Sequence, residues 1–112
     1  MAGNPKRLSA EQSASQYLEM RGFEVIELNF RRSRYAIDLI AKKNDEIYFV
    51  KLSVFGHDSY SYELVAPSHA SEMRLAAASW IEESEWAGII HYSVIEIEQH
   101  SQSVMSFIQD FM

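Results

Sequence analysis

The chain has 112 residues, of which 47% are apolar and 23% are charged, and its formal net charge is −6. This composition predicts one globular domain spanning residues 1–112 and argues against general disorder. The absence of cysteine excludes disulfides and thiolate metal sites. No apolar run approaches 18 residues, and the first twelve residues lack the apolar segment of a signal peptide. We therefore expect a cytoplasmic protein that does not enter a membrane.

Charge is divided unevenly along the chain. Residues 1–56 contain nine Lys and Arg against seven acids, whereas residues 57–112 contain one Arg against nine acids. A surface that binds polyanions must therefore come from the first half. The acidic second half permits a different function, as a surface for a protein partner or for a homodimer.

The first predicted elements are a helix and a strand. Ser9 has the side chain of an N-cap, and Gly22 is a natural C-terminal stop, so the sequence predicts a helix between them. The segment Phe23–Phe30 alternates apolar and polar residues as a strand does.

Two further strands, Tyr35–Ala41 and Ile47–Phe55, are nearly apolar throughout and are joined by the polar turn Lys42–Glu46. Continuous apolar runs of this length indicate central strands that are covered on both faces. A basic turn, Arg31–Arg34, precedes the first of them.

The second half predicts a helix that begins at Ser68 or Ser71 and ends near Ser84, then a fourth strand, Gly88–Glu98, and a short terminal helix, Ser103–Met112. The order is α-β-β-β-α-β-α. It predicts an α/β fold with a mixed sheet of about four strands flanked by helices.

The stretch Tyr35–Val54, YAIDLIAKKNDEIYFVKLSV, resembles the active-site hairpin of the YraN-like family of the restriction-endonuclease-like (PD-(D/E)XK) superfamily. The likeness extends to AEQSASQYLEMRGFEVIELNFRR, EMRLAAASWI, HYSVIEIE and FIQDFM. The resemblance implies a restriction-endonuclease-like core in which Asp, Glu and Lys hold a divalent metal and activate water. It carries the metal-binding Asp onto Asp38 and the acid of the first helix onto Glu11.

The departures from the family fall on the functional positions. Lys51 and Ser53 stand where the family has Glu and Lys, and Ala36 stands where it usually has Glu. If the family register holds, Lys51 lies beside Asp38 on the adjacent strand and neutralises its charge. We therefore expect a structural Asp38–Lys51 ion pair in place of the metal site, no cofactor, and a non-catalytic domain that binds nucleic acid or protein.

The alternative is an enzyme. A metal-dependent endonuclease with migrated ligands would hold Mg²⁺ or Mn²⁺ through Asp38 together with Glu11, Asp58 or Glu63, and Lys51 would then be a displaced catalytic lysine.

Basic side chains at the turn allow weak contact with DNA or RNA through Arg31, Arg32 and Arg34. A solvated turn is the favoured interpretation, because acids outnumber bases elsewhere in the chain. Lys6, Arg7, Lys42 and Lys43 add to the same basic half. In the connection Gly56–Ser68, Tyr60 and Tyr62 could stack on bases or pack on the sheet. The four histidines, His57, His69, His91 and His100, lack the spacing of a metal motif and predict surface or packing roles.

Overall fold

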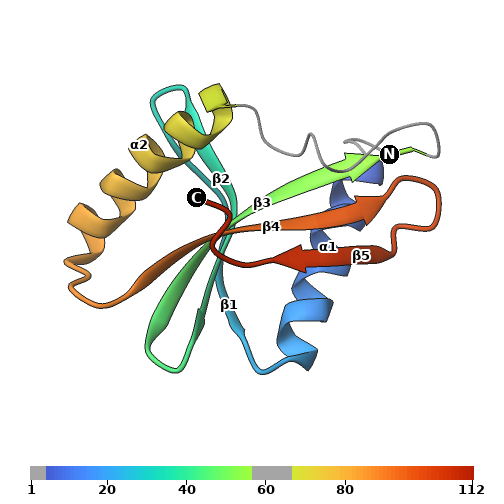
Figure 1. Cartoon of the computed structure of the whole chain (residues 1–112), viewed down its shortest axis with the longest axis horizontal. Helices are drawn as coiled ribbons and strands as arrows, with labels where there is room; N and C mark the ends of the chain where they lie inside the picture. Colours follow the sequence, from blue (N-terminus) through green and yellow to red (C-terminus); the bar gives the residue numbers. More distant parts are fainter. Residues whose placement is uncertain (1–4, 57–66) are drawn as a thin grey trace.

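The computed structural model describes residues 5–56 and 67–112, with side chains for residues 10–56 and 70–112. Two helices and five strands follow one another along these residues (Figure 1). They are α1 (Pro5–Met20), β1 (Glu24–Arg32), β2 (Tyr35–Lys43), β3 (Glu46–Phe55), α2 (Pro67–Ser84), β4 (Ile90–Glu98) and β5 (Val104–Ile108). No helix in these ranges combines the length and the apolarity that crossing a membrane requires.

The strands form one mixed sheet in the order β1-β2-β3-β4-β5. β3 and β4 run parallel, and the other neighbouring pairs are antiparallel. The parallel pair follows from the crossover through α2, since strands joined by a short hairpin must be antiparallel. The predicted α/β class, the mixed sheet and the adjacent pairing of the second and third strands are confirmed.

The helices cover opposite faces of this sheet (Figure 1). On α1, Ala10, Ala14 and Leu18 recur every four residues, so they share one side of the helix and are fully buried against the first face. On α2, Met73, Ala77 and Trp80 pack on the second face around Phe49. Small alanines at both contacts let each helix approach the sheet closely.

The start of α1 differs from the expectation, and its end agrees with it. The helix begins at Pro5, so Ser9 lies inside it and is not the N-cap. Proline suits a first helical turn because its missing N–H would have no partner there. Gly22 has a φ of 89°, and its amide donates to the carbonyl of Glu19 at 3.1 Å, so the glycine stop is confirmed.

The predicted terminal helix is wrong. Val104–Ile108 is a strand that pairs with β4, which gives the sheet five strands instead of about four. Helical spacing is present at Val104, Phe107, Ile108 and Phe111, but a short apolar run is compatible with the period of a strand as well as with that of a helix. The open edge of β4 decides between them, since it offers backbone hydrogen bonds to a fifth strand. Val104 and Phe107 then pack on the α1 face, whereas Phe111 reaches the α2 face.

Candidate functional site

Asp38 lies where the regular pairing of β2 with β3 stops. The paired register runs from Lys43↔Glu46 to Leu39↔Val50, and Asp38 is the next residue of β2. Its Oδ2 accepts a hydrogen bond from the amide of Leu52 at 2.8 Å. The side chain is 11% exposed. A buried carboxylate here therefore continues the hydrogen bonding between the strands after the backbone pairs have ended.

Lys51 stands beside this carboxylate, at the position expected from the strand register. Its Nζ lies 3.8 Å from Oδ2 of Asp38, and its side chain is 33% exposed. At this separation the contact is an ion pair, because it is longer than a hydrogen bond. The structure thus brings together the two residues that the sequence analysis singled out.

A pocket of about 330 Å³ opens over this pair. Its described lining comes from β1, the β1–β2 turn, β2, β3 and α2, and contains Arg31, Arg34, Ala36, Asp38, Lys51, Glu72 and Met73. Among these described residues, three cations and two acids face one space. The short side chain of Ala36 adds no charge where the resembling family usually has Glu.

The three turn arginines have different surroundings. Arg31 and Arg34 line the pocket, and Nη2 of Arg34 lies 3.3 Å from the hydroxyl of Tyr35. Arg32 is held elsewhere, by two hydrogen bonds to Glu83 of α2, and its guanidinium lies 4.2 Å from the centre of the Phe30 ring. Hydrogen bonding to Glu83 raises the pKa of Arg32, and the same contact lowers the pKa of Glu83.

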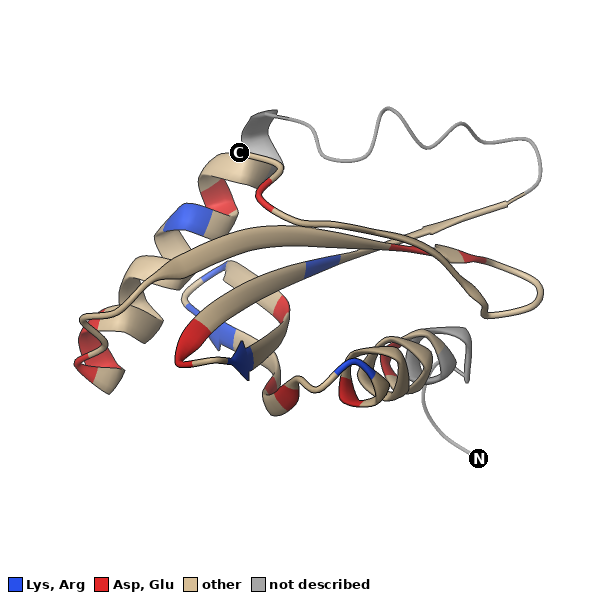
Figure 2. Cartoon of the chain, turned by 60° about the horizontal axis from the view of Figure 1, so that its bottom comes forward, with Lys and Arg blue, Asp and Glu red and all other residues tan. Residues whose placement is uncertain are grey.

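The charge asymmetry of the sequence is visible in space. Figure 2 shows the basic residues mainly along β1, β2 and β3, and a group of acids at the C-terminal end of α2. The acids of the second half that the structure describes are nevertheless distributed over three places. They are Glu72, Glu82, Glu83 and Glu85 on or just after α2, Glu96 and Glu98 on β4, and Asp110 after β5. The expected acidic docking surface stays a prediction.

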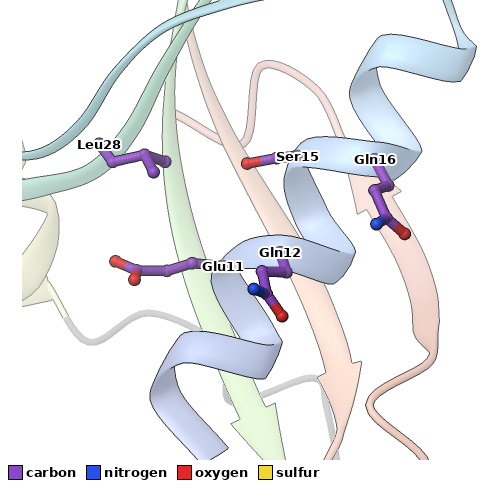
Figure 3. A pocket seen from close by; sticks show the side chains of 5 residues that line it. All are labelled: Glu11, Gln12, Ser15, Gln16 and Leu28. Carbon is purple, nitrogen blue, oxygen red and sulfur yellow. The ribbon is translucent and has the colours of Figure 1, made fainter. Parts of the chain in front are cut away.

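Glu11 lies in a different pocket from Asp38. This pocket, of about 320 Å³, is lined by Glu11, Gln12, Ser15, Gln16 and Leu28, so it lies between α1 and β1 (Figure 3). The structure does not bring Glu11 and Asp38 into one pocket. Among the described residues, no group of three or more His, Cys, Asp or Glu side chains is arranged for a metal ion.

Several sequence candidates lie outside the described part of the structure. Asp58, Glu63, His57, Tyr60 and Tyr62 fall in residues 57–66, and the side chains of Lys6, Arg7 and His69 are likewise not described. The migrated-ligand and base-stacking hypotheses that depend on them stay predictions.

The sequence analysis did not identify the arrangement around His91. Its Nε2 lies 2.5 Å from Oε1 of Glu46, and its Nδ1 lies 2.6 Å from Oδ1 of Asp110. The ring also stacks on Tyr48, with centres 4.4 Å apart. Burial works against the charged imidazolium, but the two carboxylates outweigh it and raise the pKa of His91. A neutral imidazole has one N–H, so only the protonated ring donates to both acids.

Glu96 is a second group that the sequence analysis missed. Glu96 is 5% exposed and lies opposite Ser53 in the pairing of β3 with β4. Ser106 donates a hydrogen bond to its Oε1. Its Oε2 has no hydrogen-bond partner in the described part of the chain. The sequence could have indicated Glu96, because it is an acidic residue between Ile95 and Ile97 of an apolar strand.

Glu72 also lines the Asp38 pocket and was missed. Nothing in the sequence indicated this role beyond the charge of Glu72, because its place at the pocket depends on how α2 packs.

These features together define a small α/β domain with a pocket of mixed charge on the α2 side of its sheet. The chain belongs to the uncharacterised protein family UPF0102, whose model matches residues 10–101. UPF0102 is the YraN family that the sequence resembles, so the resemblance is confirmed.

Individual relatives agree with this membership. The chain is 31% identical over 94 residues to a UPF0102 protein of Cytophaga hutchinsonii, covering 82% of this chain and 83% of the relative. It is 32% identical over 74 residues to a UPF0102 protein of Rhodopseudomonas palustris, covering 66% of this chain and 57% of that protein.

Two solved structures are more distantly similar. An XisH family protein from Nostoc punctiforme has a TM-score of 0.42 and 12% identity, covering 89% of this chain and 98% of its own. A fdxN element excision controlling factor protein from Anabaena variabilis has a TM-score of 0.41 and 9% identity, covering 94% and 99%. The family membership therefore rests on the sequence matches.

Proposed function

We propose that this domain binds single-stranded nucleic acid without cleaving it, and that Arg31 and Arg34 make the phosphate contacts. The observation that supports this function best is the pocket in which these two guanidinium groups and the ammonium of Lys51 face one space. Guanidinium groups suit phosphates because they donate in pairs to two oxygens. Glu72 and Asp38 in the same pocket limit the net positive charge, so binding is weak.

A phosphate contact without catalysis follows from the chemistry of Asp38 and Lys51. Cleavage of a phosphodiester by a Mg²⁺ enzyme needs carboxylates that hold the ion, and a cation that stabilises the charge of the transition state. Here an ammonium lies 3.8 Å from Asp38, the carboxylate onto which the sequence resemblance carries the metal-binding Asp. Lys51 repels a divalent ion at this place and substitutes for its charge.

Preference for a single strand follows from the size of the pocket. A space of about 330 Å³ holds one nucleotide and not a duplex. A single strand can turn one nucleotide inward at little cost, whereas a duplex must first unpair it.

The test is fluorescence anisotropy with labelled single-stranded and double-stranded oligonucleotides at several salt concentrations. The expected result is weak, salt-dependent binding that favours the single strand. Because each phosphate contact with a single strand contributes roughly 0.7 to the slope of log K against log salt, Arg31→Gln with Arg34→Gln should lower the slope by roughly 1.4. Arg74→Gln, which removes the same charge from an exposed position of α2 outside the described lining of the pocket, is the control. Unchanged affinity and slope in the double variant would overturn the proposal.

A further inference from the structure

A second polar pocket lies at the other end of β1 and β2, on the α1 side of the sheet. It has a volume of about 220 Å³. Four of its lining side chains end in N–H donors, and they are Arg21, Lys43, Asn44 and Gln109. No carboxylate belongs to its described lining, although acids outnumber bases in the chain. A rim of this chemistry suits an anion with several acceptor oxygens.

The local structure positions the side chain of Lys43 and the backbone of Asn44. Nζ of Lys43 donates to the carbonyl of Arg21 at 2.7 Å and lies 4.9 Å from the centre of the Phe23 ring. One of its three N–H groups is used in that bond, which leaves two for a ligand. Asn44 has a φ of 54° in the β2–β3 turn, a conformation that asparagine tolerates better than most residues.

Aromatic rings form the floor of this pocket. Phe23 lies edge-on to Tyr48 at 4.9 Å and to Phe107 at 5.7 Å between ring centres. His91 stacks on Tyr48, with ring centres 4.4 Å apart, and its two ring nitrogens are held by Glu46 and Asp110, so the Tyr48 ring is fixed in position. A floor of this kind accepts a flat apolar group beside the anionic one.

A purely structural role explains part of the arrangement. A lysine at the carbonyl end of a helix stabilises the exposed carbonyl groups, and Lys43 does so for α1. The helix end does not require the convergence of Arg21, Asn44 and Gln109 on the same space, since Gln109 comes from the far end of the chain. That convergence indicates a ligand.

We propose that this pocket binds a phosphate monoester carried on a flat apolar group. Three terminal phosphate oxygens match a rim of four donor side chains better than the two oxygens of a carboxylate do. The site is distinct from the pocket that contains Arg31 and Arg34, because the two have no described lining residue in common.

The test is a calorimetric titration of the whole chain with phenyl phosphate, inorganic phosphate and benzoate. Phenyl phosphate should bind most tightly, because inorganic phosphate lacks the ring that contacts the floor, and benzoate offers the rim two oxygens instead of three. Asn44→Asp and Gln109→Glu keep the side-chain shape but replace a donor by a negative charge, and each should weaken binding about tenfold or more. Arg21→Gln should weaken it as well.

The controls separate this site from the proposed nucleic-acid contact. The titrations are repeated in the Arg31→Gln with Arg34→Gln background, which removes the proposed nucleic-acid contact, and phenyl phosphate should still bind there. Thermal unfolding should show that Asn44→Asp and Gln109→Glu are folded. Absence of phenyl phosphate binding at millimolar concentration would overturn the inference. Equal affinity in the native chain and in the folded rim variants would also overturn it.

Discussion

Arg32 on β1 donates two hydrogen bonds to the carboxylate of Glu83 on α2, at 2.6 Å from Nε to Oε2 and 2.5 Å from Nη2 to Oε1. The pair joins the edge of the sheet to the end of the helix that covers it. It also occupies one arginine of a basic turn whose other two arginines line the pocket. The three turn arginines look equivalent in the sequence, but only Arg31 and Arg34 face the pocket, whereas Arg32 is bound to Glu83.

This difference predicts how single charges affect nucleic-acid binding. Arg32→Gln should change affinity much less than Arg31→Gln or Arg34→Gln, because Arg32 is already engaged. Glu83→Gln should increase affinity, since it releases Arg32 and removes a negative charge near the turn. Anisotropy titrations of each variant measure both effects, with Glu82→Gln as the control for general loss of negative charge. Equal losses in the three arginine variants would contradict the assignment.

Asp38 should be important for stability whether or not anything binds. Asp38→Ala removes the acceptor of the Leu52 amide, and a buried donor left without its partner costs about 1–3 kcal/mol. Asp38→Asn keeps an oxygen that can accept this bond, so it should cost less. Urea denaturation measures the free energy of unfolding of each variant. A neutral effect of Asp38→Ala would show that the Leu52 contact contributes little.

Restoring the family residues should create a metal site. Lys51→Glu with Ser53→Lys replaces the ammonium beside Asp38 by a second carboxylate and returns a lysine two residues along β3, on the same face. Calorimetry should detect Mg²⁺ or Mn²⁺ binding in this variant and not in the native chain. Adding Asp38→Ala should abolish it. Cleavage of DNA or RNA by the native chain that disappears with Asp38→Ala would instead support the endonuclease alternative.

His91 should make stability depend on pH above its ordinary pKa of 6.5. The two carboxylates raise the pKa of His91 in the folded chain, so the folded state holds the proton more tightly than the unfolded state. The resulting stabilisation is complete below pH 6.5 and is lost as the pH rises through the raised pKa. Chemical denaturation over this range should therefore show stability falling with pH. His91→Gln should flatten the curve, and His100→Gln, in the β4–β5 turn, should not.

The sequence predicted the elements that local patterns determine. These elements depend on residues that are close together in the chain. They are the continuous apolar strands on either side of the turn at Asn44, the helical repeat of Ala10, Ala14 and Leu18, and the helix stop at Gly22. The contact of Asp38 with Lys51 was expected from the family register, and the pairing of the hairpin from Lys43↔Glu46 to Leu39↔Val50 agrees with it.

Other parts of the site depend on packing between distant segments. Nothing near Arg32 in the sequence indicates that Glu83 is its partner, 51 positions away. His91 meets Glu46 and Asp110 only because β3, β4 and the segment after β5 come together. The strand Val104–Ile108 was mistaken for a helix because its pairing with β4 overrides an ambiguous local pattern.

The order of the strands has a consequence for synthesis on the ribosome. Each strand neighbours its predecessor in the chain, so α1 and the β1–β2–β3 meander can assemble before β4 has been made. Until then β3, with Phe49 and Val50 at its centre, is an open apolar edge. A nascent chain halted after α2 would present that edge to other chains, and pairing with β4 covers it.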